Sequence, residues 1–428
     1  MTEPVQQDSK VAAYSWYALG VLFLVNVFHV VDRQVFSILQ DSIKADLHLS
    51  DTMLGLLSGL AFALFYTTFG IPIARLADRR TRTKIVAVAL FVWSGMTALC
   101  GMATGAATLA LARIGVGVGE AGCAPATHSL LSDYFPPHRR STAFAVLTAG
   151  TSIGLALGFF LGGFFDRVIG WRHTLMILAA PGIVLSVFVF LFLREPERGR
   201  FDMQGKGAQA DAQMPLPQVL RYLWNIRTFR YVLFAYGLHF LAVQGAGAWK
   251  ASFFRRTFQQ VDVATLGGAL GVAAAFGVVG VLGGGILADR LVKRDQRWFT
   301  WMPILTILLA MPFFVAMLFV PDWRWAVVFY TFDIGLNAAF TGPTLALMQQ
   351  LVPGRLRAVS SSLVLLAVSL IGMGLGPLSI GAMSDALAPG FGALSLRYAL
   401  LSAVVVNIAA IAFYLRAARS VRSDLAPG

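Results

Sequence analysis

The chain has 428 residues, of which 57% are hydrophobic and 13% are charged, and its formal net charge is +13. A soluble domain carries about 25% charged residues, so this composition excludes a soluble enzyme or binding domain. The Lys and Arg excess does not indicate a nucleic-acid partner, because these residues gather in loops between apolar runs, as in membrane proteins.

Apolar runs long enough to cross a bilayer, roughly 17–25 residues each, recur along the whole chain. They predict an all-α integral membrane protein with 12 transmembrane helices and almost no domain outside the membrane. The expected segments are 14–39, 52–76, 84–104, 107–132, 142–166, 172–193, 229–254, 264–288, 298–320, 323–350, 359–384 and 394–416.

The positive residues are concentrated in alternate loops and at the C-terminus. Because Lys and Arg favour the cytoplasmic side of a membrane, we expect both termini to be cytoplasmic. The sequence MTEPVQQDSK lacks the basic start of a signal peptide, and the first segment is too long for a signal core, so that segment is expected to stay as an anchor. These features predict a multi-pass protein of the cell inner membrane whose basic loops contact anionic lipid headgroups.

Signatures of enzymes and metal sites are missing from the sequence. Cys100 and Cys123 lie inside apolar segments, so neither a disulfide framework nor a two-cysteine metal site is expected. The chain has no HExxH and no phosphate-binding loop, which argues against an enzyme and an ATP-driven pump. We therefore expect no cofactor and no metal.

The polar stretch 194–227 divides the apolar segments six and six, which predicts an N-terminal lobe (1–193), a cytoplasmic linker (194–227) and a C-terminal lobe with a short tail (228–428). The two halves of the chain contain corresponding motifs. ARLADRR at 74–80 corresponds to GILADRL at 285–291, and FPPHRRST at 135–142 corresponds to VPGRLRAV at 352–359. Parallel repeats of six helices are known in transporters, where two lobes rock around a midplane site, and they fit a channel less well.

Four charges lie inside two apolar segments of the N-terminal half: Asp32 and Arg33 in the first, and Arg113 and Glu120 in the fourth. Each costs free energy in hydrocarbon, so such groups are candidates for a functional site. A rise of 1.5 Å per residue places Asp32 and Arg113 at a similar depth, and Glu120 follows Arg113 by two turns. Arg113 can then be shared by two carboxylates, and its displacement would let a carboxyl group gain or lose a proton.

Three further readings concern the same region. Arg33 points about 100° away from Asp32, which leaves it free for an anionic ligand. His29 lies one turn before Arg33 and is either a proton relay or a packing residue. The alternative to a functional cluster is a static ion pair that fixes the first and fourth helices.

In the C-terminal half, Asp333 and Asn337 lie one turn apart in segment 323–350 and are candidates for the substrate site. At the cytoplasmic ends, Asp78 and Asp289 follow the second and eighth segments, each next to an Arg, and can accept hydrogen bonds from basic residues. Glycines spaced by four in segment 142–166 allow close helix packing, inside a lobe or where lobes slide.

The LADRR and LADRL loops resemble motif A of the major facilitator superfamily, although Ala74 stands where that pattern prefers Gly. The resemblance covers nearly the whole chain and implies the major facilitator fold, with two pseudo-symmetric six-helix lobes. Within the superfamily, VVDRQVFSIL and RIGVGVGEAGCAPATHSLLSDYFP are similar to the Spinster family. That likeness implies that Asp32, Arg113 and Glu120 form the protonation and switching site. It also implies a cytoplasmic gate that latches in the outward-open state, at Arg75, Asp78, Arg79, Arg140, Asp289 and Arg290.

These observations together predict a secondary active transporter that works by alternating access. We expect proton coupling through Asp32 and Glu120 and substrate binding or switching through Arg33, Arg113, His29, Asp333 and Asn337. The family likeness implies an anionic amphiphile as substrate, such as a lysophospholipid or a sphingosine-1-phosphate-like lipid. The alternative is a facilitator or proton-coupled carrier of small organic anions or drugs. The expected partners are protons, membrane lipids and the substrate, and the fold is expected to act as a monomer.

Overall fold

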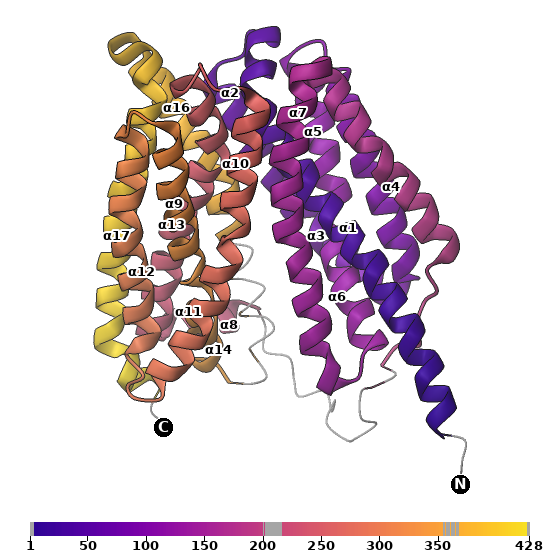
Figure 1. Cartoon of the computed structure of the whole chain (residues 1–428). Coiled ribbons are helices and arrows are strands. Elements are labelled where there is room, and N and C mark those ends of the chain that lie inside the picture. Colours follow the sequence, from indigo (N-terminus) through magenta and orange to yellow (C-terminus); the bar gives the residue numbers. More distant parts are fainter. Residues whose placement is uncertain are drawn as a thin grey trace. The chain divides into compact units, whose positions relative to one another are not determined.

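A computed structural model of the chain describes residues 4–199, 201, 216–353, 356, 360, 364 and 368–425. The regular structure of these residues is entirely helical, which confirms the expected all-α architecture (Figure 1). The chain divides into two compact units, each built from separate stretches. Unit 1 comprises Met1–Leu49, Ala61–Gly205 and Asp262–Gly271, and unit 2 comprises Ser50–Leu60, Lys206–Val261 and Val272–Gly428.

Unit 1 is built mainly from the N-terminal helices. These are α1 (Pro4–Leu47), α3 (Ala61–Arg79), α4 (Arg82–Gly101), α5 (Ala106–Glu120), α6 (Cys123–Tyr134) and α7 (Pro137–Phe192), joined by the first residues of α10 (Val263–Ala275). The helix α7 packs against both α1 and α4, and α5 packs against α3 and α4.

Unit 2 contains the remaining elements. These are α2 (Asp51–Gly55), the π-helical turn η1 (Leu56–Leu60), α8 (Leu216–Asn225), α9 (Arg227–Thr257), α11 (Gly277–Val292), α12 (Trp298–Phe319), α13 (Trp323–Ala338), α14 (Thr341–Gln350), the π-helical turn η3 (Ser369–Leu375), α16 (Gly376–Phe391), the short 3-10 turn η4 (Gly392–Leu394) and α17 (Ser395–Leu425). The C-terminal helix α17 packs against α9, α12 and α16.

Twelve membrane crossings can be followed through the described helices. Among the residues that the structure describes, nine stretches are long and apolar enough to span a membrane. The stretch Thr142–Phe192 holds two crossings, because Gly170 takes a left-handed conformation (φ 76°) that an L residue rarely adopts. The stretch Ser369–Leu425 also holds two, α16 and α17, separated at Gly392 (φ 52°). The one remaining crossing, the tenth along the chain, consists of the shorter helices α13 and α14. With it the described helices make twelve crossings, so the expected number is confirmed.

Several crossings are interrupted near their middle, and the interruptions recur in corresponding helices of the two halves. The fourth crossing breaks between α5 and α6, and the tenth breaks between α13 and α14. The second crossing contains the π-helical turn η1 between α2 and α3, and the eighth breaks between α10 and α11. Interrupted helices in matching positions are a feature of transporters built from repeats, and their ends supply polar groups to a central site.

The glycines of α7 provide close packing inside unit 1. A Cβ atom at Gly154 would lie 2.7 Å from the Val27 carbonyl oxygen and from Val30 Cβ, and one at Gly158 would lie 2.6 Å from Gln34 Cβ. Successive glycines therefore meet successive turns of α1. Asn26 ties the same two helices through a 2.8 Å hydrogen bond to the Leu147 carbonyl oxygen.

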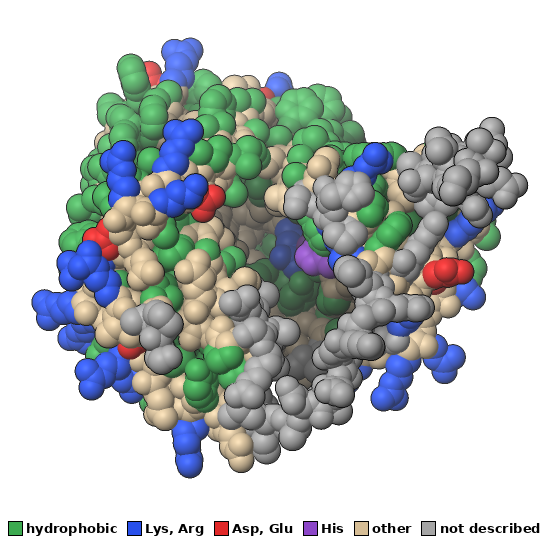
Figure 2. Space-filling model, turned by 90° about the horizontal axis from the view of Figure 1, so that it is seen from below, with side chains coloured by type: hydrophobic (Ala, Val, Ile, Leu, Met, Phe, Trp, Pro, Cys, Tyr) green, Lys and Arg blue, Asp and Glu red, His purple; other side chains and the backbone are tan. Residues whose placement is uncertain are grey.

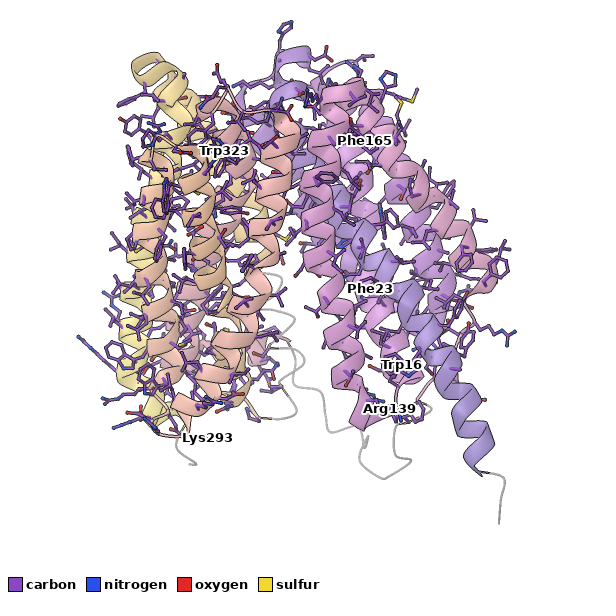
Figure 3. The ribbon with its side chains drawn as sticks, viewed as in Figure 1. Trp16, Phe23, Arg139, Phe165, Lys293 and Trp323 are labelled. Carbon is purple, nitrogen blue, oxygen red and sulfur yellow. The ribbon has the colours of Figure 1, made fainter. Side chains whose placement is uncertain are left out.

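The two ends of each unit can be told apart from labelled side chains (Figure 3). In unit 1, Trp16 and Arg139 lie toward one end and Phe165 toward the other. In unit 2, Lys293 lies at one end and Trp323 near the opposite end. Arg139 and Lys293 mark what we call the basic end of each unit.

Close packing of α7 on α1 leads to a first prediction. Gly154→Ala should reduce the free energy of unfolding by about 1–3 kcal/mol, because the added methyl group overpacks the interface with α1. Gly20→Ala is the matched control, since a Cβ at Gly20 meets nothing within 4 Å. Apparent melting temperatures of the purified variants in detergent would test this. Equal melting of the two variants would contradict the packing assignment.

Candidate functional site

The centre of unit 1 holds a buried carboxylate with two basic partners, which we call the Glu120 cluster: His29, Arg33 and Glu120. The Glu120 side chain is fully buried. Its Oε2 atom lies 2.7 Å from both Arg33 Nε and Arg33 Nη2, and 2.9 Å from His29 Nε2. Among the described residues, Glu120 Oε1 is buried without a hydrogen-bond partner.

Local sequence explains why these three side chains meet. His29 and Arg33 are one turn apart on α1 and therefore share a face. Glu120 is the last residue of α5, and the helix is interrupted directly after it. A Cβ at Gly117 would lie 2.9 Å from the Phe62 carbonyl oxygen, and one at Gly119 would lie 2.7 Å from the Trp93 amide nitrogen. These glycines let α3 and α4 approach the turn that carries the carboxylate.

Arg33 is also in contact with aromatic rings of α3. Its guanidinium carbon lies 4.6 Å from the ring centroid of Phe62 and 5.3 Å from that of Tyr66. The Arg33 side chain is 25% exposed, whereas its partner Glu120 is not exposed at all. The expectation that Arg33 is free for a ligand is therefore wrong as stated, because Arg33 is the ion-pair partner of Glu120. It is still the more exposed member of the pair.

Asp32 and Arg113 flank the Glu120 cluster without entering it. Asp32 accepts a 2.6 Å hydrogen bond from the Thr97 hydroxyl of α4. The guanidinium carbon of Arg113 lies 4.2 Å from the ring centroid of Phe36 and 5.5 Å from that of Phe62. Arg33 thus supplies a guanidinium that holds Glu120, a contact that sequence spacing on α5 did not indicate.

Unit 2 contains a second buried ion pair, between Lys250 of α9 and Asp333 of α13. Lys250 Nζ lies 2.5 Å from Asp333 Oδ2, and the two side chains are 9% and 2% exposed. Asn337 donates to Asp333 Oδ1 at 2.7 Å, so both residues predicted in this half belong to one cluster. The Lys250 ammonium also faces the Tyr330 ring, 4.8 Å from its centroid. Sequence reasoning missed Lys250, although it is a single Lys inside the apolar run AGAWKASFF.

The internal repeat relates the two clusters. The offset that relates Pro136 to Pro353 in the repeated motif also relates Arg33 to Lys250 and Glu120 to Asn337. In each half of the chain, a cation on the first crossing therefore faces acidic or amide groups on the fourth crossing. Asn337 occupies the position that corresponds to Glu120, and the carboxylate of unit 2 lies one turn before it, at Asp333.

At the basic end of unit 1, Arg82 forms a buried network that sequence reasoning also missed. Its guanidinium donates to Asp133, to Ser129 Oγ at 2.8 Å and to Glu195 Oε1 at 2.7 Å. Arg198 donates to the carbonyl oxygens of Ala77 and Arg80 at 2.7 and 2.6 Å. The first residues after α7 are thus fastened to the ends of α3 and α4.

The predicted gate residues are only partly engaged in these contacts. Arg140 donates to the carbonyl oxygens of Ser132 and Phe135 at 3.1 and 3.2 Å. Arg75 and Arg79 are exposed on α3, as are Asp289 and Arg290 on α11. The side chain of Asp78 lies outside the described part of the chain. Over the described ranges, no cluster of His, Cys, Asp and Glu has the composition of a metal site.

Comparisons with known proteins assign the class. The profile of the Major Facilitator Superfamily matches residues 22–377, so the chain belongs to the major facilitator superfamily. It is therefore a multi-pass membrane transporter and not an enzyme.

Individual relatives show which members of the superfamily the chain is similar to. An MFS-type efflux pump of Mycolicibacterium smegmatis is 33% identical over 411 residues, which are 95% of this chain and 93% of the relative. A probable L-galactonate transporter of Escherichia coli is 26% identical over 296 residues, 68% of this chain and 65% of the relative. The crystal structure of a bacterial homolog to the human lysosomal transporter Spinster, inward-facing and unoccupied, matches with a TM-score of 0.87 and 28% identity over 99% of both chains. Within the superfamily, the chain resembles the Spinster family, as its motifs indicate.

The Lys250–Asp333 pair leads to a second prediction. Lys250→Met and Asp333→Asn should each destabilise the protein by about 3–5 kcal/mol, because each leaves a buried group without its partner. The double variant should regain most of this loss. Thermal unfolding of the three variants in detergent measures the coupling between the two residues. A double variant no more stable than the worse single variant would show that the two side chains do not depend on each other.

Proposed function

We propose that the chain is a proton-coupled secondary transporter that moves an anionic amphiphile, such as a lysophospholipid or a sphingosine-1-phosphate-like lipid, by alternating access. The observation that carries the proposal is the Glu120 cluster. A fully buried carboxylate is neutralised there by an Arg that is itself partly exposed.

The first step is competition for Arg33. A phosphate or carboxylate group binds the planar fork of a guanidinium through two hydrogen bonds. Glu120 receives one hydrogen bond from Arg33, so such a group can compete with it. An anionic substrate that engages Arg33 therefore weakens the ion pair that holds Glu120. A carboxylate that loses its counter-charge in apolar surroundings takes up a proton. Substrate anion and proton then bind together, and release of one favours release of the other.

The remaining charges fit supporting roles in this scheme. His29 contacts the same carboxylate oxygen as Arg33 and is placed to pass a proton to Glu120. Asp32, next to Arg33 in the chain, is a second proton site, held by Thr97. Arg113 is a switching residue that packs on Phe36 and Phe62 beside the cluster. In unit 2, Lys250, Asp333 and Asn337 form the equivalent polar group.

The amphiphilic part of the proposal is supported by the rings beside Arg33. Phe62 and Tyr66 stack with their centroids 5.6 Å apart, and Phe65 and Phe69 form a further stacked pair on α3. A headgroup on Arg33 thus has an aromatic surface next to it, which suits an apolar tail. The resemblance to the Spinster family supports the same substrate class.

The alternative is a carrier of small organic anions or drugs. A guanidinium fork binds the carboxylate of a small acid as well as a lipid phosphate. One relative is named as a probable L-galactonate transporter, and another as an efflux pump. Both substrate classes use the same Arg33, so they must be separated by assay.

We also propose that the basic ends face the cytoplasm and that the protein resides in the cell inner membrane as a monomer. The support is the positive-inside rule. Lys and Arg side chains outnumber Asp and Glu side chains among those that Figure 2 presents. Its partners would be the substrate, protons and membrane lipids, with no nucleic acid among them. The gate assigned to Arg75, Asp78, Arg79, Arg140, Asp289 and Arg290 would then act on the cytoplasmic side.

The transport mechanism gives a third prediction. In proteoliposomes, a pH gradient should drive lysophospholipid flux by the wild type. Glu120→Gln should lose this drive by at least about tenfold, since a charged hydrogen bond is worth roughly 1.5–3 kcal/mol. Asp32→Asn and Arg113→Ala should lose it as well. Glu197→Gln, which alters an exposed carboxylate, is the control and should behave as the wild type.

Two outcomes would count against the proposal. If every variant moves substrate equally and the gradient has no effect, the charges are structural. If the gradient drives an acid such as galactonate but not the lysophospholipid, the alternative substrate class is correct.

The orientation gives a fourth prediction. Single cysteines introduced at Lys293 and at Trp323, in a background without Cys100 and Cys123, should react differently with a membrane-impermeant maleimide. In intact cells only the cysteine at position 323 should be labelled, because the basic end is held inside. Labelling at 293 alone would reverse the orientation.

A further inference from the structure

A pocket of about 480 Å³ lies at the basic end of unit 2, between the start of α9 and the end of α17. Its lining is dominated by groups that bind phosphate: three Arg side chains, a Tyr and two Ser hydroxyls. The lining residues are Arg227, Tyr231, Arg416, Arg419, Ser420, Ser423 and Asp424. One carboxylate faces three guanidinium groups, so the pocket carries a net positive charge.

The single carboxylate is already engaged by the backbone. Asp424 Oδ2 accepts a 2.8 Å hydrogen bond from the Thr228 amide and so caps the first turn of α9. The Thr228 hydroxyl lies 2.7 Å from Ser420 Oγ, which joins the same two helices again. These contacts hold the ends of α9 and α17 together and fix the spacing of the arginines. The helix start that they cap also favours an anion, because its dipole is positive there.

Apolar side chains lead from the membrane-spanning part of the helices to this pocket. On α17, Val405, Ile408 and Leu415 are 68%, 56% and 40% exposed. Arg416 and Arg419 lie about three turns beyond Val405 and Ile408 and continue the same face. An acyl chain along this face therefore ends at the two arginines.

The neighbouring helix α9 also has an apolar side chain and an arginine on one face. Phe234 lies two turns along α9 from Arg227, on the same face, and its ring centroid is 5.5 Å from that of Phe413 on α17. Beside it, Trp224 of the amphipathic helix α8 is 52% exposed. Exposed Trp side chains favour the depth of the lipid headgroups. The pocket therefore has aromatic and aliphatic groups toward the membrane core and cations at headgroup level.

We propose that this pocket binds the phosphodiester headgroup of an anionic phospholipid, with an acyl chain lying along the exposed face of α17. Basic pockets between membrane helices are known to suit such headgroups. The three guanidinium groups supply the charge, and Tyr231 supplies a hydroxyl donor. This lipid is a bound component of the transporter, and the inference does not depend on the transported substrate.

The test compares lipid retention by the purified full-length protein in detergent. Native mass spectrometry would count bound dioleoyl phosphatidylglycerol after incubation with equal amounts of this lipid and dioleoyl phosphatidylcholine. The triple variant Arg227→Gln, Arg416→Gln, Arg419→Gln should bind phosphatidylglycerol about a hundredfold more weakly, since each basic residue near an anionic lipid contributes roughly fivefold. The matched control is Lys293→Gln, Arg294→Gln, Arg297→Gln, which removes the same charge from exposed positions outside the pocket.

The proposal is supported if the control retains the lipid and the pocket variant loses it. It is overturned if both triple variants lose it equally, because binding is then a property of overall charge. Ser423→Glu places a single negative charge in the pocket and should also weaken lipid binding. This single variant provides the test if the triple variant does not fold. Thermal unfolding with inorganic phosphate separates the two phosphate sources. Protection by phosphate without protection by phosphatidylglycerol would assign the pocket to a free anion and overturn the lipid.

Discussion

An ionised side chain in the interior of a membrane protein needs a counter-charge on a neighbouring helix, and this constraint organises both units. Glu120 has no exposed surface, and its charge is balanced by Arg33 from another helix. Lys250 and Asp333 satisfy the same requirement in unit 2. In each case the pair joins the first helix of a repeat to the fourth. The helix rotations, the glycine contacts around Glu120 and the interruption after it all serve to bring these partners within hydrogen-bond distance.

The same constraint explains why a buried pair can also be a device for coupling. A pair whose members are equally buried stays closed, because neither is open to an outside ion. In the Glu120 cluster the members differ, since Arg33 is partly exposed and Glu120 is not. Under the proposed mechanism, an external anion replaces one partner and leaves the other in need of a proton. The Lys250–Asp333 pair lacks this asymmetry, because both side chains are almost completely buried.

Charges outside the membrane interior follow a different rule, because water and lipid headgroups can neutralise them. At the basic end of unit 1, Arg82 is nevertheless buried, and it gathers Asp133 and Glu195 around it. The pocket at the basic end of unit 2 is lined by three arginines and one carboxylate, namely Arg227, Arg416, Arg419 and Asp424. The first arrangement is complete by itself, whereas the second has an excess of positive charge that suits an anionic ligand.

Sequence alone determined the membrane class, the number of crossings, the internal repeat and the identity of most intramembrane charges. These properties are local or periodic: hydropathy, loop charge and spacing can all be read along one chain. The tertiary structure alone decided which charges meet. Spacing on α5 did not indicate that Arg33 holds Glu120, and Lys250 was overlooked beside Asp333. Helical periodicity shows which residues share a face, whereas the rotation and approach of neighbouring helices, set by glycine contacts and by helix interruptions, decide what that face meets.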